Sequence, residues 1–132
     1  MEVAQKAHIS GKDLAKPVMV KLDGKMAMAV LPATYKVDLD LLRNATQASN
    51  VELATEAEFE KVFPDCEVGA MPPFGRLYGM QTFVAQTLSE DEEIAFSAGN
   101  HSELIRLSYG DYQKLEEPTI IAFSKKGSKK GY

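Results

Sequence analysis

The segment 63–75 holds the densest group of residues that could position a small polar ligand. It contains two glycines, three prolines and the only cysteine of the chain within thirteen positions. Proline fixes the backbone angle φ and lacks an N–H donor, whereas glycine adopts angles that other residues avoid. The segment therefore cannot form a regular helix or a central strand. We expect a stiff loop with exposed backbone amides, and composition alone is equally compatible with a rigid connector.

Three side chains of this sequence are candidates for catalysis. Lys16 begins a predicted strand, and His101 follows a glycine in a predicted strand connection. By residue type alone, each is more typical of a solvated surface position. Cys66 could act as a nucleophile with His101 as its base. Its neighbours Asp65 and Glu67 are negatively charged and would raise the pKa of the thiol, which disfavours that interpretation.

Hydrophobic periodicity and turn residues predict a single α+β domain with a mixed, curved β-sheet flanked by short helices. Asp23-Gly24 predicts a hairpin, and Thr55 with Glu58 forms a capping box that begins a helix. Pro17 predicts an edge position or a bulge near the start of its strand. The expected strands are residues 14–22, 25–31, 51–54, 81–85, 94–97, 102–107 and 119–123, and the expected helices are residues 2–8, 38–45, 55–62 and 108–115.

The charge of the chain is unevenly distributed. The net charge is -4, and the last four charged residues, in the segment 125–132, are all lysines. We expect a domain of residues 1–124 followed by this segment as a flexible basic tail. Without those lysines the body has 11 basic and 19 acidic residues, a net charge of -8. A domain with this much negative charge is not expected to bind nucleic acids in general. Contact with RNA would need a local basic patch, and its affinity would depend strongly on salt concentration.

Composition also limits the location and cofactors that we expect. One cysteine cannot form an internal disulfide, which is compatible with a cytoplasmic protein. The first residues contain no apolar segment of a secretory signal, and no apolar run reaches membrane-spanning length. Only His8 and His101 could supply imidazole ligands. We therefore expect no metal site and no cofactor.

Several motifs resemble those of the YbaK/ProX family, whose members are free-standing relatives of the editing domain inserted in bacterial prolyl-tRNA synthetase. Residues 66–75 resemble the Gly-x-x-x-Pro loop of that family. Ala15-Lys16 before an apolar strand is similar to its Ala-Lys-Thr or Ala-Lys-Ser motif, residues 53–59 to its Leu-Ala-Thr-Glu-x-Glu-Leu motif, and residues 98–101 to its Ala-Gly-x-His turn. The resemblance covers about residues 9–123.

The resemblance implies the family's fold and a trans-editing activity, the hydrolysis of the ester of a tRNA charged with the wrong small amino acid, such as Ala, Ser or Cys. It implies that the 3′ end of an aminoacyl-tRNA is the partner, with a synthetase as a further candidate, and leaves the oligomeric state open. Carried over residue by residue, it implies catalytic roles for Lys16, Gly69 and His101. It implies substrate-binding roles for Ala70, Met71, Pro72, Pro73, Phe74, Gly75, Gln86, Gly99 and Asn100.

Two positions depart from the family pattern. Pro17 stands where Thr or Ser is usual, and Gln86 stands where many relatives carry Asp. Proline removes a hydroxyl and an N–H, and glutamine offers a carbonyl oxygen without charge. These departures favour an alternative, a non-catalytic tRNA- or synthetase-binding module of the same fold.

Overall fold

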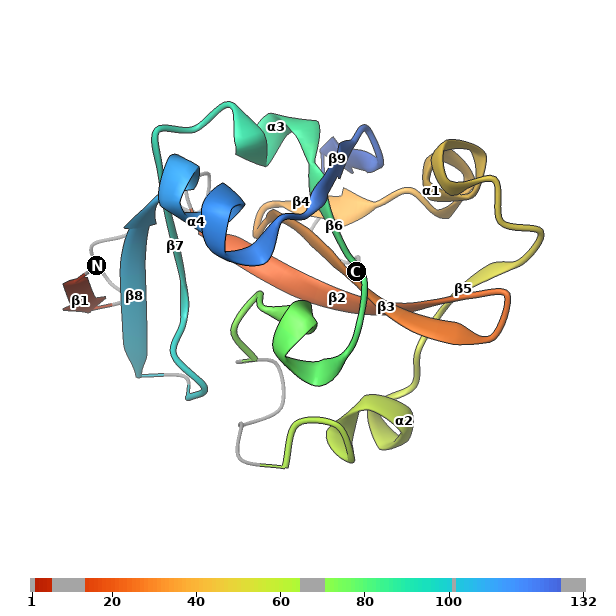
Figure 1. Ribbon diagram of the computed structural model, residues 1–132, viewed down its shortest axis with the longest axis horizontal. Helices are drawn as coiled ribbons and strands as arrows, with labels where there is room; N and C mark the ends of the chain where they lie inside the picture. The colour runs from red at the N-terminus through yellow and green to blue at the C-terminus, as the bar shows by residue number, and fades with distance from the viewer. Residues whose placement is uncertain (1, 6–13, 65–70, 101, 127–132) are drawn as a thin grey trace.

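The central element of the protein is a mixed five-stranded sheet with the order β5-β2-β3-β6-β9. The computed structural model (Figure 1) describes residues 2–5, 14–64, 71–100 and 102–126. β3 pairs antiparallel with β2 and parallel with β6, so the two kinds of pairing meet in the middle of the sheet. The strands are β5 (Val51–Leu53), β2 (Ala15–Leu22), β3 (Lys25–Pro32), β6 (Thr82–Ala85) and β9 (Thr119–Ile121).

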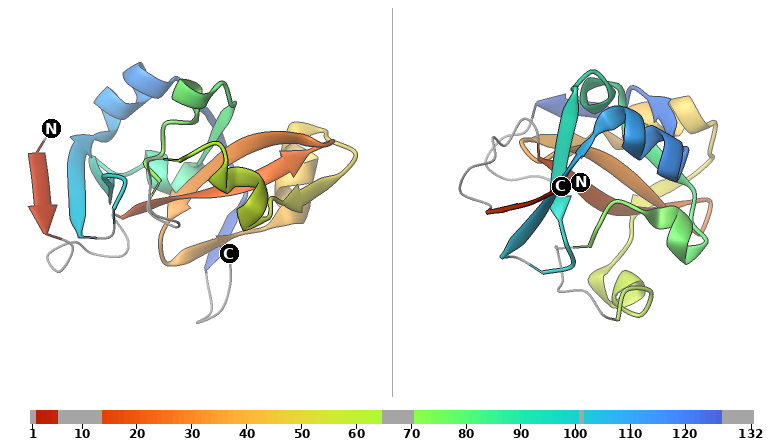
Figure 2. Two further views of the ribbon diagram at one scale, coloured as in Figure 1. Left: turned by 90° about the horizontal axis from the view of Figure 1, so that it is seen from below. Right: turned by 60° about the vertical axis from the view of Figure 1, so that its left-hand side comes forward.

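Two smaller sheets complete the β-structure. The order β1-β8-β7 joins β1 (Glu2–Gln5), β8 (Glu103–Ser108) and β7 (Glu93–Ser97), and β10 (Ser124–Lys126) pairs with β4 (Tyr35–Val37). A bridge between Leu14 and Ala95 connects the start of β2 to β7. Figure 2 shows β1 and β8 at one end of the molecule and the β2–β3 hairpin reaching toward the other. This arrangement confirms the predicted fold class.

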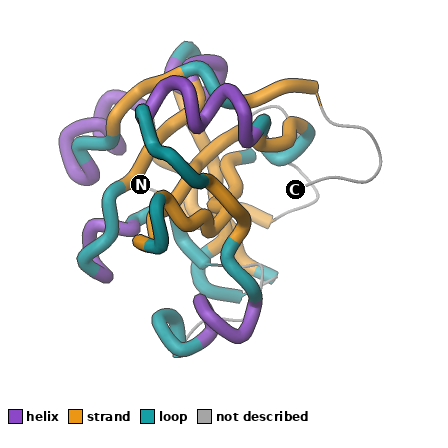
Figure 3. The backbone as a smooth tube through the Cα atoms, turned by 90° about the vertical axis from the view of Figure 1, so that its right-hand side faces the viewer, coloured by secondary structure: helices purple, strands orange, loops and turns teal. Residues whose placement is uncertain are grey.

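Short helices lie around the strands (Figure 3). Capping side chains begin three of them. Asp38 accepts hydrogen bonds from the first turn of α1 (Leu39–Thr46), and Ser108 accepts one from the backbone N–H of Asp111 in α4 (Tyr109–Glu116). Thr55 and Glu58 form the predicted capping box of α2 (Glu56–Glu60). α3 (Gln86–Ser89) follows β6 directly. A turn of 3₁₀ helix spans Gly75–Tyr78. No helix in the described part of the chain is long and apolar enough to cross a membrane.

The hydrophobic core consists of two clusters, one on each face of the five-stranded sheet. Residues directly opposite each other on paired strands share a face. Met19 and Met28 are such a pair and belong to the first cluster, with residues of β7, β8 and α4. Val20 and Ala27 are the next pair and belong to the second cluster, which includes residues of α1 and β4. The alternation along β2 and β3 therefore determines which side chains can meet.

Local signals in the hairpin were predicted correctly. Asp23 and Gly24 both have positive φ, 51° and 85°, as the tight turn between β2 and β3 requires. Pro17 lies in a part of β2 that pairs with β3 alone, because pairing with β5 begins at Val20. The predicted edge position at Pro17 is confirmed.

Two expectations at the chain ends differ from the structure. The predicted helix 2–8 is wrong for its first residues, because Glu2–Gln5 form β1 and pair antiparallel with β8. This pairing is non-local and outweighs a weak, uncapped helix signal. The predicted tail begins inside β10, where Lys125 lies opposite Lys36, so the fold continues two residues beyond the expected boundary at residue 124. Residues 127–132 lie outside the described residues.

Gly75 allows a close approach between the loop before it and β6. A Cβ atom at this position would lie 2.7 Å from Thr82 Oγ1 and 3.2 Å from Met28 Cβ. Thr82 cannot move away without losing the hydrogen bond that its hydroxyl donates to Glu116. The glycine of the Pro-Phe-Gly sequence is therefore required for packing.

We predict that Gly75→Ala lowers the free energy of unfolding by about 1–3 kcal/mol, the usual cost of overpacking a tight core. The matched control is Gly110→Ala in α4, where a Cβ would meet nothing within 4 Å. This control should be neutral or stabilise the protein by up to about 1 kcal/mol. Urea unfolding of the three proteins measures both effects, and equal stabilities of the two variants would contradict the packing argument.

Candidate functional site

The described part of the predicted substrate loop, Met71–Gly75, is firmly held against the core. Met71, Pro73 and Gly75 are buried, and the Phe74 ring packs at a centroid distance of 5.4 Å from the rings of Phe96 and Tyr112. The Tyr112 hydroxyl donates a hydrogen bond of 2.7 Å to the carbonyl oxygen of Pro73. Burial raises the pKa of Tyr112, so its hydroxyl stays protonated and available as a donor.

These contacts separate the predicted loop residues by role. Met71 is a member of the first core cluster, so its side chain packs the interior. Pro72 and Phe74 are half-buried and remain able to contact a ligand. Gly69 and Ala70 lie outside the described residues. The structure thus shows that the end of the loop is rigidly anchored. The role of the loop's backbone N–H groups as donors to a substrate stays a prediction.

Lys16 lies at the start of β2, directly opposite Leu31 of β3. Leu31 belongs to the second core cluster, whereas Met71 and Phe74 pack with the first. The strand register therefore places Lys16 and the loop on opposite faces of the sheet. The lysine is half-buried, and this burial lowers the pKa of its ammonium group by desolvation.

Gln86 lies at the same end of the sheet as Lys16. It is exposed and begins α3, immediately after β6 ends at Ala85. Val30 of β3 pairs with Val84, so Leu31, the partner of Lys16, is level with Ala85. The start of β2 and the β6–α3 junction are two strand spacings apart, about 10 Å. The structure thus brings Lys16 and Gln86 to the same end of the sheet.

The turn between β7 and β8 contains Gly99 and Asn100. Gly99 has a φ of 95°, which favours glycine. Asn100 Oδ1 accepts hydrogen bonds from Ser102 N (2.9 Å), Ser102 Oγ (2.8 Å) and Glu103 N (2.9 Å). Its side-chain carbonyl oxygen is therefore used by the turn. His101 lies outside the described residues.

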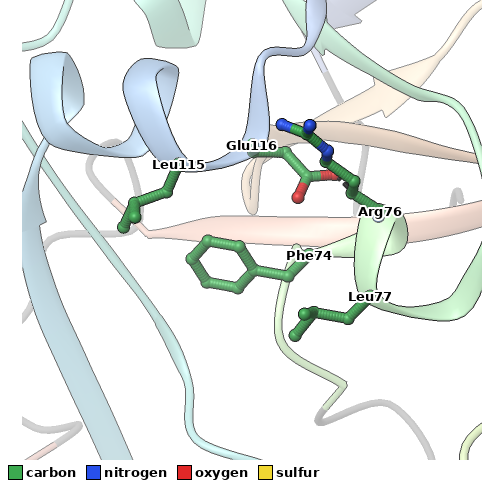
Figure 4. Close-up of a pocket in the computed structure, with 5 residues that line it drawn as sticks. All are labelled: Phe74, Arg76, Leu77, Leu115 and Glu116. Atoms are coloured by element: carbon green, nitrogen blue, oxygen red, sulfur yellow. Dashed lines mark hydrogen bonds between the residues drawn. The ribbon is translucent and has the colours of Figure 1, made fainter.

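A cavity that the sequence did not reveal adjoins the loop. It has a volume of about 490 Å³ and is lined by Phe74, Arg76, Leu77, Leu115 and Glu116 (Figure 4). Of the described residues that line it, Phe74 alone was among the predicted site residues. One feature of the sequence could have indicated this cavity. Glu116 follows the predicted helix 108–115, and a negative charge at a helix C-terminus is unfavourable for the helix dipole.

Glu116 is the buried acidic group of this region, with 3% of its surface exposed. Its Oε2 accepts hydrogen bonds from the Thr82 hydroxyl and, at 3.0 Å, from the backbone N–H of Arg76. Burial raises the pKa of the Glu116 carboxyl, and those two hydrogen bonds together with the charge of Arg76 oppose the rise. The group links α4, β6 and the 3₁₀ turn.

Comparisons with known proteins agree on one family. The family model described as the aminoacyl-tRNA editing domain matches residues 1–115. The chain is 29% identical over 114 residues to the multifunctional Ser/Thr-tRNA deacylase ProXp-y of Escherichia coli (strain K12). The matched region covers 83% of this chain and 68% of that protein. It is 30% identical over 74 residues to the proline–tRNA ligase of Bacillus mycoides (strain KBAB4), 56% of this chain and 13% of the ligase.

Two solved structures share the fold. One is a proposed trans-editing enzyme for prolyl tRNA synthetase, with a TM-score of 0.78 and 13% identity over 94% of this chain and 86% of that one. The other is a hypothetical protein with a TM-score of 0.79 and 16% identity over 90% of this chain and 79% of that one. At this level of identity, the likeness shows the fold alone.

The raised pKa of Glu116 predicts a specific pH dependence for Glu116→Gln. An acid whose pKa is higher in the folded state destabilises the fold as pH rises from its ordinary value near 4.5 toward the folded value. Glutamine keeps an oxygen for Thr82 and Arg76 but does not ionise. The stability of the variant relative to the parent should therefore increase between pH 4 and pH 7.

Urea unfolding at several pH values measures this difference. The control is Glu117→Gln, whose side chain is 66% exposed and pairs with Arg76 at the surface. Its stability relative to the parent should vary less with pH, because an exposed ion pair contributes little. A difference for Glu116→Gln that decreases as pH rises would show that the hydrogen bonds outweigh burial.

Proposed function

The chain belongs to the aminoacyl-tRNA editing domain family, and we propose that it hydrolyses the ester that joins a wrong amino acid to the 3′ end of a tRNA. The family match over residues 1–115 carries this proposal, and the 29% identity to a Ser/Thr-tRNA deacylase supports it. The proposed partner is an aminoacyl-tRNA in the cytoplasm. A synthetase is a second proposed partner, because part of the chain is similar to a proline–tRNA ligase.

The proposed chemistry places few demands on side chains. An aminoacyl ester is reactive, so the protein must position the carbonyl group, stabilise the developing oxyanion and admit a water molecule. We assign the oxyanion donors to the backbone N–H groups of Gly69, Ala70 and Met71. The Tyr112 hydrogen bond to Pro73 and the packing of Phe74 would keep these donors in place during the reaction.

Lys16 supplies the cation in this mechanism. A partly desolvated ammonium group interacts more strongly with the terminal phosphate or ribose than one in water. β2 is bridged to β7 at Leu14 and pairs with β5 from Val20 onward, so Lys16 lies between these two pairings, where we propose that its long side chain turns toward the substrate. His101 would orient the substrate, with Gly99 and Asn100 shaping the turn before it.

We propose a small amino acid as the one removed. The named substrates of the Escherichia coli relative, Ser and Thr, make serine the first candidate, with alanine and cysteine next. A pocket separates such residues from larger ones by shape, and each methylene is worth roughly 1–3 kcal/mol. Gln86 would approach the aminoacyl group without a negative charge, which weakens selection of its ammonium.

A binding module without turnover is the second proposal. Pro17 and Gln86 favour it, since both lie at the Lys16 end of the sheet and both replace a polar or charged group usual in the family. Such a module would retain the anchored loop and its affinity for tRNA or for a synthetase.

The test is deacylation of tRNAs mischarged with Ser, Thr, Ala or Cys. The parent protein should hydrolyse at least one of them, and Lys16→Ala should lower the rate by on the order of 10²-fold, the loss typical when a stabilising group is removed. The control is Lys25→Ala, an exposed lysine at the start of β3, which should stay within about twofold. Absence of hydrolysis in a folded protein that binds tRNA would contradict the enzyme and favour the binding module.

Cys66→Ala separates this mechanism from thiol catalysis. Ester hydrolysis with backbone oxyanion donors does not use the thiol, so the variant should deacylate the same tRNA at close to the parent rate. A loss comparable with that of Lys16→Ala would instead assign Cys66 as a nucleophile. The same rate assay serves for both variants.

A further inference from the structure

The cavity beside the loop combines apolar walls with a buried carboxylate. Phe74, Leu77 and Leu115 form its apolar lining, and Glu116 supplies the carboxylate. Leu77 and Leu115 are 78% and 55% exposed, so the cavity opens to solvent between them. The Arg76 guanidinium at its rim forms an ion pair with Glu117.

One oxygen of Glu116 is available to a ligand. Both hydrogen bonds of the carboxylate, from Thr82 and from the backbone of Arg76, end on Oε2. Among the described residues, no hydrogen bond or ion pair of Glu116 involves Oε1. Figure 4 shows one carboxylate oxygen directed toward Arg76 and the other toward the space above Phe74. Oε1 is not among the buried polar atoms that lack a partner, so it is accessible from the cavity, where a ligand that carries a donor can bind it.

The cavity is separate from the proposed catalytic position. Thr82, which holds Glu116, begins β6, whereas Ala85 ends it next to Gln86. Three residues of a parallel strand span about 10 Å. Lys16 also lies on the opposite face of the sheet, as its pairing with Leu31 shows. Within the described ranges, the cavity and the predicted substrate site share Phe74 alone.

We propose that this cavity binds an alkylammonium group. The ammonium would donate to Oε1 of Glu116, and the methylene chain would lie against Phe74 and the two leucines. An anion would meet the Glu116 carboxylate, with the nearby guanidinium already paired to Glu117. A purely apolar ligand would cover Oε1 without giving it a partner. A cation with an apolar stem can pack against the apolar walls and also donate a hydrogen bond to the carboxylate.

Two sources could supply this chemistry: a free alkylamine, or a lysine side chain on a partner polypeptide. The exposed leucines at the rim would contact apolar residues flanking such a lysine, which a free amine lacks. The source is therefore decided by comparing affinities for the two kinds of probe.

The experiment is a titration of the full chain with n-butylamine, followed by two-dimensional amide NMR. The expected result is saturable shifts at Arg76, Thr82 and Glu116. Glu116→Gln should weaken binding by about tenfold or more, because a hydrogen bond to a charged acceptor is lost. This variant keeps an oxygen for Thr82 and Arg76, and its urea midpoint verifies folding.

Two controls make the result specific. Glu117→Gln removes the neighbouring exposed charge and should change the affinity for n-butylamine by less than about twofold. The neutral isostere n-butanol should bind the parent at least about tenfold more weakly than n-butylamine. Equal binding of the two probes, or unchanged binding in folded Glu116→Gln, would overturn the proposal, as would an absence of saturable shifts.

A second probe identifies the source. The probe is a blocked Leu-Lys-Leu peptide, titrated in the same way. Tighter binding of the peptide than of n-butylamine, lost in Glu116→Gln, would support a partner polypeptide. Equal or weaker binding of the peptide, with n-butylamine still dependent on Glu116, would support a free amine.

Discussion

The contact between the C-terminal half of α4 and the loop is the constraint on which the site depends. Tyr112 binds the Pro73 carbonyl, and Glu116 binds both Thr82 and the backbone of Arg76. These hydrogen bonds join segments that lie 34 to 40 residues apart in sequence. They close only because Gly75 has no side chain to separate the turn from β6. A loop rich in proline and glycine thereby acquires one shape instead of many.

The second constraint is the alternation of side chains across the central sheet. It divides the chain into a face that carries the loop and α4 and a face that carries α1 and β4. Lysines of one strand are separated in the same way, since Lys21 binds Glu58 on the loop's face while Lys16 lies across from Leu31 on the other. Charges that are close in sequence therefore do not form one basic patch.

Local features of the fold were predictable because their physical cause lies within a few residues. The Asp23-Gly24 turn and the Thr55 capping box are of this kind. Pairing of β1 with β8 was not predictable, because it depends on contacts about a hundred residues apart. Glu116 was missed for a related reason: its hydrogen-bond partners come from two other elements, and its own sequence context indicated only a helix end.

The candidate site residues divide into two groups: those that support the shape of the loop, and those whose residue type can change without loss of the fold. Pro73 and Gly75 are buried parts of the loop anchor, so a change there alters stability and any activity together. Lys16 is half-buried where β2 pairs with β3 alone, and Gln86 is exposed at the start of α3, so substitutions there cost the fold less than substitutions in the buried anchor. Departures from a family pattern can therefore accumulate at that end while the fold persists. Pro17 and Gln86 are both found there, so conservation of the fold and of the loop does not by itself imply conservation of the amino acid that is removed.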